Sequence, residues 1–339
     1  MGKKKEWIGW LLFFFFLLVG MSFFSLLKGA VPVSLSEIFR VGEKILKGEK
    51  ISSHPLYPIL FQVRLPRILA ALLVGASLSV AGVILQGMFR NPLVEPYTLG
   101  VSGGAAVGIT LSTLCGLTLP YFFPLTGLLG AIGGIVLVYF IASSGGRLAL
   151  PTLLLSGVMV SFFSSSLIML IMSLASPSQL QGILYWTMGS LQSVSFKELK
   201  VGGGAMLGGI IFAFFFIREL NALTLGEEEA SWLGINVERT KKILFFLSSL
   251  LTGGAVALTG VIGFVGLMVP HLVRGVVGTD HRILLPASCL LGGSFLVGAD
   301  LLARTIASPL ELPVGVITGV AGAIIFIYCL RIRKVEFRW

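Results

Sequence analysis

The stretch Asn221–Ile235, Asn-Ala-Leu-Thr-Leu-Gly-Glu-Glu-Glu-Ala-Ser-Trp-Leu-Gly-Ile, separates two long apolar regions of the chain. Its three consecutive acids are conspicuous in a chain with only 15 Asp and Glu in all. Divided at Gly226, it is predicted to form one or two short helices with an apolar and a charged side. Such a segment between membrane helices is usually a solvated loop, but this one is compact and has basic neighbours. We therefore expect a docking surface for a soluble partner on the cytoplasmic face. The residues expected to form it are Leu223, Leu225, Gly226, Glu227, Glu228, Glu229, Ala230, Trp232, Leu233 and Gly234.

The composition on either side of this stretch is that of a membrane protein. Charged residues make up 12% of the 339 residues, against about 25% in ordinary globular proteins, and 55% are hydrophobic. The 43 glycines agree, because small residues let membrane helices approach closely. The net charge of +10 comes from short clusters between apolar runs, with no basic stripe for nucleic acid. A soluble multidomain protein and a nucleic-acid-binding protein are both excluded.

Ten apolar runs have lengths near the ~20 residues that cross a bilayer, although 264–277 is short and contains Pro270. The predicted spans are 7–27, 68–88, 99–116, 119–142, 148–174, 201–217, 243–262, 264–277, 283–303 and 312–330. The first follows Lys3–Lys5 and is too long for the apolar core of a signal peptide. An even count places the basic C-terminus (Arg331, Arg333, Lys334, Arg338) on the cytoplasmic side with the N-terminus. We expect an all-α polytopic protein with a single domain over 1–339.

Between the first two spans, Ser34 or Ser36 is predicted to cap a short amphipathic helix that continues to Leu46 at the membrane surface. Small residues at helical spacing predict close helix packing. They are Gly100/Gly104/Gly108, Gly130/Gly134, Gly204/Gly208 and Gly315/Gly319. A weak repeat relates 75–84 to 254–262, and the span count makes the two segments run in opposite directions. This predicts inverted halves, about 7–217 and 240–332, on either side of a 221–235 connection.

Few residues offer chemistry of their own. Cys115, Cys289 and Cys329 are odd in number, and His54, His271 and His281 lack metal-ligand spacing, so neither a disulfide framework nor a metal site is indicated. His271, after Pro270, is expected to be a hydrogen-bonded residue at a helix break.

Clustered arginines at the other end of the bundle predict binding to carboxylates of a partner. Arg64 and Arg67 surround Pro66, which favours an extended approach to the second span, and Arg304 ends the ninth. Interfacial snorkelling of the arginines is the alternative, and Asp300 lies one turn before Arg304. The proline-broken link Arg90–Tyr97 either lines a cavity or meets protein, or it forms a plain tight loop.

Several motifs now coincide in order over residues from about 64 to the C-terminus. They are Arg64-Leu-Pro-Arg67, Gly82-Val-Ile-Leu-Gln-Gly87, Arg90-Asn-Pro-Leu-Val-Glu-Pro96, Leu99-Gly-Val-Ser-Gly-Gly104, Gly226-Glu-Glu-Glu-Ala-Ser-Trp-Leu-Gly234, Gly263-Phe-Val-Gly-Leu-Met-Val-Pro-His271, Thr279-Asp-His-Arg282 and Glu311-Leu-Pro-Val-Gly315. In these motifs the chain resembles the FecCD family of ABC-importer permeases, which serves vitamin B12, haem and iron-siderophore uptake.

The resemblance implies a type II importer permease with ten spans that works as a homodimer in the inner (plasma) membrane, surrounded by lipid, with both termini cytoplasmic. Two cytoplasmic ATPase subunits, which carry the ATP and magnesium, would dock on the helices matching 223–233, and this chain would bind no cofactor. An external substrate-binding protein would meet Arg64, Arg67 and Arg304. The cytoplasmic gate would be formed by Asn91 and Leu93 and by the start of span five around Leu150 and Leu154, although Pro151 weakens the transfer of individual residues there.

Two hypotheses for the function follow from the sequence. In the first, the chain is a permease without catalytic residues, moved by a partner ATPase, with ferric siderophore as the leading cargo, cobalamin or haem next, and smaller oxyanions open. In the second, it is an ion-coupled carrier acting alone, for which Asp300 is the one convincing intramembrane acid. An intramembrane enzyme lacks any nucleophile–base or metal-ligand pair.

Overall fold

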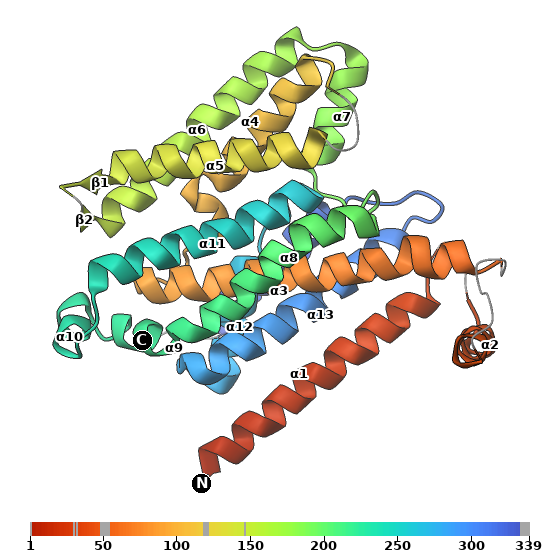
Figure 1. Ribbon diagram of the computed structural model, residues 1–339, viewed down its shortest axis with the longest axis horizontal. Coiled ribbons are helices and arrows are strands. Elements are labelled where there is room, and N and C mark those ends of the chain that lie inside the picture. The colour runs from red at the N-terminus through yellow and green to blue at the C-terminus, as the bar shows by residue number, and fades with distance from the viewer. Residues whose placement is uncertain are drawn as a thin grey trace.

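A computed structural model describes residues 2–29, 31, 33–47, 55–117, 122–145 and 147–332 of the chain (Figure 1). His54, Arg333, Lys334 and Arg338 lie outside the described residues, as does the side chain of Cys329. Over the described part the regular structure is helical, apart from a short hairpin whose strands have two residues each. In it β1 (Ser143–Ser144) pairs antiparallel with β2 (Arg147–Leu148). The prediction of an all-α membrane fold is confirmed.

By length and composition, seven helical segments of the described chain are able to cross a membrane. They contain α1 (Gly2–Leu27), α3 (Leu65–Phe89), α5 (Phe122–Ala142), α6 (Leu150–Leu174), α8 (Phe196–Ala213), α11 (Val237–Thr259) and α13 (His281–Thr305). Three shorter apolar helices accompany them, namely α4 (Val101–Leu114), α12 (Val265–Val277) and α14 (Val314–Ile332). Together they correspond one to one with the ten predicted runs, so a count of about ten spans holds.

The helix α3 forms the core of the bundle, where it packs against α8, α11, α12 and α13. Glycines let these backbones touch. A Cβ on Gly75 would lie 2.2 Å from the carbonyl oxygen of Gly292 in α13, and one on Gly82 would lie 1.9 Å from that of Gly266 in α12. Any side chain at these positions would separate the helices, so the small residues fix how closely α3 is enclosed.

The helices α4, α5 and α6 pack on one another as a second unit, at the top of Figure 1. The predicted glycine faces meet here, since a Cβ on Gly104 would lie 2.3 Å from the Gly130 carbonyl oxygen and one on Gly108 2.2 Å from that of Thr126. Gly204, Gly208 and Gly319 have no atom within 4 Å of a Cβ position among the described residues, so these glycines do not mediate helix packing within the single chain. Glycine spacing identifies a flat helix face but not the neighbour that covers it.

Figure 1 shows α3 and α11 running in opposite directions side by side, as the inverted repeat predicts. The two ends of the bundle therefore differ. At one end lie the β hairpin and the short helices α9 (Ile217–Leu223) and α10 (Glu227–Trp232); we call this the α10 end. At the other lies α2 (Leu35–Leu46), roughly perpendicular to the spans; we call this the α2 end. Ser34 caps α2 as predicted: its Oγ accepts from the Glu37 N–H at 3.3 Å, and Glu37 Oε2 accepts from the Ser34 N–H at 2.8 Å.

Three local expectations need correction. A helical segment, Pro58–Arg64, runs into α3 without a break, and Leu65 is helical despite Pro66. The segment is a π-helix, whose wider turn leaves room for a proline that lacks the N–H of a regular helix. Pro270 likewise lies inside α12, so His271 is not at a helix break. The helix α7 (Pro177–Thr187) was missed, although Ser176 and Gln179 form a capping box at its start.

Candidate functional site: a surface and a junction at the α10 end

The stretch 221–235 forms the end of α9, all of α10 and a turn on either side, as predicted. Two glycines set the turns. Gly226 precedes α10 with φ of +148° and Gly234 ends it with φ of +81°, both of which disfavour residues with a Cβ. The three acids Glu227, Glu228 and Glu229 occupy the first turn of α10, where the helix dipole favours negative charge. The local sequence therefore determines where this short helix begins and ends.

The α9–α10 segment divides into a buried and an exposed side. Leu223 and Ala230 are buried in the core. Leu225, Trp232 and Leu233 are exposed, and Trp232 exposes 82% of its surface. An indole this open, beside the exposed acids Glu228 and Glu229, is unusual for a single chain and typical of the centre of an interface. We call Leu225, Glu228, Glu229, Trp232 and Leu233 the α10 surface.

A buried lysine ties the α10 surface to the bundle. The ammonium of Lys241, in the first turns of α11, lies 3.0 Å from Glu227 Oε2 in α10 and 2.7 Å from Glu238 Oε1 in its own helix. It also donates to the carbonyl oxygen of Leu148 in β2 at 3.0 Å, and Glu238 Oε2 accepts from the Leu148 N–H at 2.8 Å. We call these four residues the Lys241 junction. It joins α10, α11 and the strand that leads directly into α6.

The helix α9 is anchored through Asn221 to the start of α13. The Asn221 Nδ2 donates to Asp280 Oδ1 at 3.0 Å, and its Oδ1 accepts from the His281 N–H at 2.9 Å. The His281 ring is buried and its Nε2 faces α3, since a Cβ on Gly87 would lie 2.9 Å from that nitrogen. A displacement of α9 would therefore act on α13 and on the end of α3.

The link Arg90–Tyr97 after α3 is hydrogen-bonded to the connection between α11 and α12. The Tyr97 hydroxyl donates to the Ile262 carbonyl oxygen at 2.9 Å and accepts from the Ile262 N–H at 3.1 Å. Glu95 Oε1 accepts from the N–H of Phe264 at 2.7 Å, where Phe264 has a φ of +69°. Burial raises the pKa of the Glu95 carboxyl, while that hydrogen bond acts in the opposite direction. Of the two sequence interpretations, the link meets protein and is not a free loop.

The four predicted gate residues lie near this link but differ in exposure. Asn91 Oδ1 accepts from the Leu93 N–H at 2.9 Å, and the Leu93 side chain is exposed. Leu150 and Leu154, in the first turns of α6, pack against the core. Pro151 lies in the first turn of α6, where proline is tolerated. Their role as a gate remains a prediction.

The predicted docking arginines at the α2 end are buried. Arg67 pairs with Asp300 and Glu311, each at 2.7 Å, and Arg304 lies 3.2 Å from Asp300. Arg64 donates to the carbonyl oxygens of Leu26, Leu27 and Val31, and Arg304 donates to Ser25. Each of the three exposes 4% of its surface or less, so snorkelling does not describe them. In the single chain all of these arginine contacts are intramolecular. The negative charge of Asp300 is balanced by the guanidinium groups of Arg67 and Arg304.

No group of three His, Cys, Asp or Glu side chains able to hold a metal ion occurs among the described residues. Cys115 and Cys289 are free thiols. The sequence did not predict three sets of contacts: the Lys241 junction, the hydrogen bonds of Asn221 to the start of α13, and those of Glu95 and Tyr97 to the connection between α11 and α12. These polar residues were visible in the sequence, but key partners are remote in the chain: Lys241 and Leu148 are 93 residues apart, Asn221 and His281 are 60 apart, and Glu95 and Phe264 are 169 apart.

A helical bundle of about ten spans, with an exposed apolar and acidic surface joined to its core at one end, is the arrangement expected of a membrane transporter subunit that a soluble partner acts on. The chain belongs to the FecCD transport family, whose model matches residues 17–332. It is thus a permease subunit of an ABC importer, in which ATP hydrolysis is carried out by a separate ATPase subunit.

Individual relatives agree with this family. The chain is 42% identical over 278 residues to the cobalamin import permease BtuC of Halobacterium salinarum, covering 81% of this chain and 73% of the relative. It is 37% identical to the hemin transport permease HmuU of Yersinia pestis, covering 96% of both. A solved structure described as an inward-facing metal-chelate type ABC transporter superimposes with a TM-score of 0.83 at 33% identity, over 96% of this chain and 99% of that one.

Proposed function

We propose that this permease carries a metal chelate inward, with ferric siderophore as the first candidate and cobalamin or haem next. The observation that carries the proposal is the agreement among relatives. Similar chains are named as permeases for cobalamin, hemin and Fe(3+) dicitrate, and the solved neighbour is of the metal-chelate type. A relative named for molybdate import keeps oxyanions as the competing cargo.

The α10 surface is proposed to receive the ATPase subunit, which would hold ATP and magnesium while this chain holds no cofactor. Support comes from the exposure of Trp232 and from the Lys241 junction beneath it. Movement of α10 would pull on Glu227, and Lys241 would pass that movement to Leu148, two residues before α6 begins. The α10 end is then the cytoplasmic end, and both termini lie on that side of an inner (plasma) membrane.

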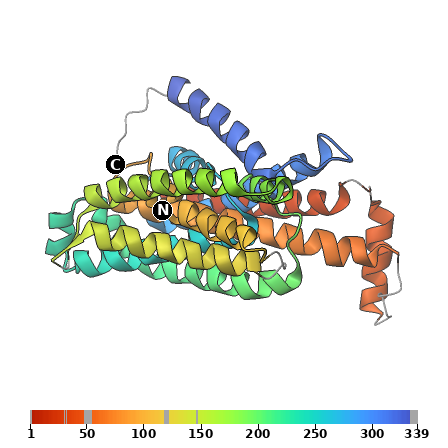
Figure 2. The same cartoon turned by 90° about the horizontal axis from the view of Figure 1, so that it is seen from above.

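A second copy of the chain is proposed to complete the transport path. Within its own chain α14 packs mainly against α12 and α13, and Figure 2 shows it projecting from one side of the bundle. Its outward residues Val320, Ile324 and Ile327 are more than half exposed. A homodimer closed through this side would cover them.

The external binding protein is proposed to dock at the α2 end, near Arg64, Arg67 and Arg304. Glu311, part of the segment 306–313, is the most exposed partner in the arginine cluster. A carboxylate from the binding protein would compete with Glu311 for Arg67. Docking at these arginines therefore requires that segment to move.

The ion-coupled carrier is the less favoured function. Its proton or cation would have to bind Asp300, which exposes 1% of its surface and lies between Arg67 and Arg304. Two positive charges at this distance strongly disfavour the binding of a further cation at Asp300.

The cargo proposal is tested by uptake into proteoliposomes that contain this chain, its ATPase and its binding protein. Labelled ferric siderophore, cobalamin, hemin and molybdate are supplied in parallel, with ATP or with a non-hydrolysable analogue. Uptake of a chelate that requires hydrolysable ATP supports the proposal. Uptake of molybdate alone would contradict the cargo, and uptake that follows an ion gradient without ATP would contradict the mechanism.

A further inference from the structure

A groove lies between α5, α8 and α11, and the α7–α8 connection that borders it reaches the start of α14, where the Gly315 N–H donates to the Gly189 carbonyl oxygen at 3.4 Å. It consists of two adjoining cavities of about 560 and 440 Å³ that share Pro124, Glu198, Ala257 and Leu258. These volumes fall within the range of small-molecule sites. None of the residues of the α10 surface, the Lys241 junction or the arginine cluster lines the groove.

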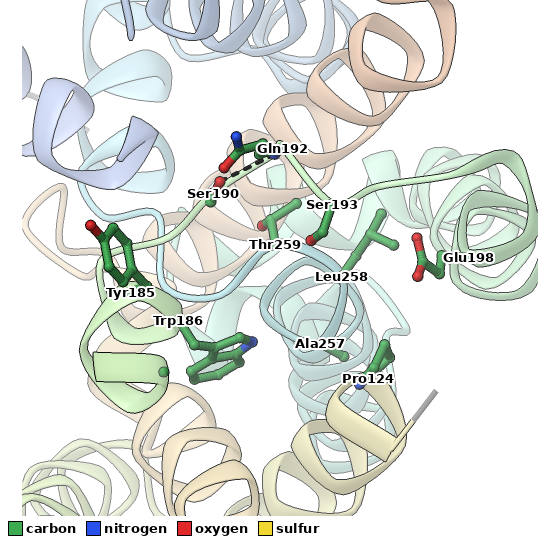
Figure 3. Close-up of a pocket in the computed structure, with 11 residues that line it drawn as sticks. Pro124, Tyr185, Trp186, Ser190, Gln192, Ser193, Glu198, Ala257, Leu258 and Thr259 are labelled. Atoms are coloured by element: carbon green, nitrogen blue, oxygen red, sulfur yellow. Dashed lines mark hydrogen bonds between the residues drawn. The ribbon is translucent and has the colours of Figure 1, made fainter. Parts of the chain in front are cut away.

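The larger cavity has the aromatic side chains of the groove and most of its polar ones. Figure 3 shows Tyr185 and Trp186 of α7 on one side, and Ser190, Gln192 and Ser193 of the α7–α8 connection along its edge. The Ser190 hydroxyl accepts from the Gln192 N–H at 3.1 Å, which leaves its own proton to donate outward. Tyrosine and tryptophan beside hydroxyl and amide groups are typical of the membrane–water interface.

The smaller cavity is apolar and lies deeper in the bundle. Along α8 its lining continues from Glu198 to Gly202 and Ala205, and along α11 from Leu258 back to Leu250. Leu125 and Leu128 of α5 form the third wall. A Cβ on Gly202 would meet no atom within 4 Å, so the space beside α8 is open. The groove therefore changes from polar to apolar along the direction of the membrane-spanning helices.

A pair of opposite charges lies where the two cavities meet. Lys197 is exposed at the edge of the apolar cavity, and Glu198 lines both cavities. Glu198 Oε2 accepts from the Ser195 N–H at 2.7 Å, which fixes the carboxylate at this boundary. Adjacent residues on a helix do not face each other, so Lys197 and Glu198 do not pair with one another.

We propose that this groove is a binding site for one zwitterionic phospholipid, with one of its acyl chains in the apolar cavity, its phosphate at Lys197 and its ammonium at Glu198. The order of polarity selects an amphiphile, and the two opposite charges select a headgroup that carries both signs. A transmembrane helix of another protein would fill the apolar cavity but would leave the polar one and both charges unmatched.

The experiment is native mass spectrometry of the chain released from bilayers of phosphatidylethanolamine and phosphatidylglycerol in equal amounts. The wild type is expected to keep one phosphatidylethanolamine per chain in clear excess over phosphatidylglycerol. Gly202→Leu places a side chain in the apolar cavity and should reduce retention about tenfold. The matched control is Gly208→Leu on the same helix, where a Cβ also meets no atom within 4 Å but does not line the groove. It should retain lipid as the wild type does.

The headgroup contacts are tested by a second pair. Lys197→Gln should lower retention of both lipids about threefold or more, whereas Lys200→Gln, exposed one turn later, should not. Glu198→Gln keeps an acceptor for the Ser195 N–H and should abolish the preference for phosphatidylethanolamine. Equal retention by the wild type and Gly202→Leu, or a bound protein in place of lipid, would overturn the proposal.

Discussion

At the scale of single residues, Lys241 makes the contacts that would pass a movement of α10 to α11 and to the start of α6. Its side chain is 3% exposed and its ammonium reaches three segments, whereas its partners Glu227 and Glu238 are 45% and 35% exposed. The sequence showed Lys241 only as one of several basic neighbours of the acidic stretch. That it contacts Leu148 was not predictable, because the two residues are brought together by the packing of the β hairpin against α11.

Lys241→Met is expected to lower the free energy of unfolding by about 1–3 kcal/mol, since the lysine is buried but its acidic partners are partly solvated. ATP-driven uptake should be lost while the ATPase still binds and hydrolyses ATP. Thermal unfolding in detergent, ATPase assay and uptake are measured on one preparation. Arg239→Met, exposed in the same helix, is the control, and Lys241→Arg should restore uptake. Normal uptake by Lys241→Met would show that the junction does not transmit.

Gly82 and Gly208 provide a matched test of helix packing. Gly82→Ala would place a Cβ 1.9 Å from the Gly266 carbonyl oxygen and should destabilise the protein by about 1–3 kcal/mol. Gly208→Ala meets open space and should be neutral or stabilising, because alanine favours helix. The measurement is the unfolding temperature of both variants in the same detergent. Similar shifts for the two would mean that α3 and α12 are not in backbone contact.

Glu95 is expected to make stability depend on pH. The pKa of the Glu95 carboxyl is raised in the folded chain. Its contribution to the free energy of unfolding is therefore fully present below the ordinary carboxyl pKa of 4.5 and is lost as the pH rises through the folded pKa. Glu95→Gln keeps an acceptor for Phe264 and stays neutral. The variant should therefore gain in unfolding temperature relative to the wild type as pH rises above 4.5. A difference that is constant with pH, or that has the opposite sign, would contradict this expectation.

At the scale of elements, the apolar runs were predictable because hydropathy alone identifies a membrane span. The first and last residues of the helices were less predictable, because capping residues determine them. The helix α8 begins at Phe196, before the predicted 201, because Ser195 and Glu198 form a capping box. The short helices α9 and α10 were predictable from Gly226 and the acids beside it. The missed α7 also had a local signal, in Ser176 and Gln179, but with 11 residues it is too short to be recognised as an apolar span.

The α10 surface is expected to bind its partner chiefly through Trp232. Trp232→Ala should weaken co-purification of the ATPase by a factor of about ten or more, as removal of a central interface aromatic does. The fold should be unaffected, because the side chain is 82% exposed. Leu310→Ala, 73% exposed at the α2 end, is the control and should leave ATPase binding unchanged. Loss of ATPase from the Leu310 variant instead would reverse the assignment of the two ends.

The acids of α10 are expected to differ from one another. Glu227→Lys places a second cation beside Lys241 and should reduce both stability and uptake. Glu228→Lys, on the exposed α10 surface, should lower ATPase affinity while leaving the unfolding temperature unchanged. Uptake that is normal in both variants would contradict the docking assignment of this stretch.

At the scale of the whole molecule, the fold class and family followed from composition and ordered motifs. The sequence did not predict which helices pack against which. Glycine faces such as Gly204/Gly208 have the spacing of packed helices but meet no described neighbour. Residues buried by one chain and residues awaiting a partner look alike in sequence. The arginine cluster shows the same limit, since Arg64, Arg67 and Arg304 have the composition of a docking site and the burial of a structural one.

In the proposed orientation, the α10 end faces the ATPase and the α2 end faces the binding protein. This orientation is tested most directly by photo-crosslinking in the assembled, membrane-bound complex, with a photoreactive amino acid placed at position 232 or, separately, at position 310. We expect the probe at 232 to form an adduct with the ATPase subunit and the probe at 310 to form none with it. An adduct of the binding protein with the probe at 232, or of the ATPase with the probe at 310, would contradict the proposed orientation.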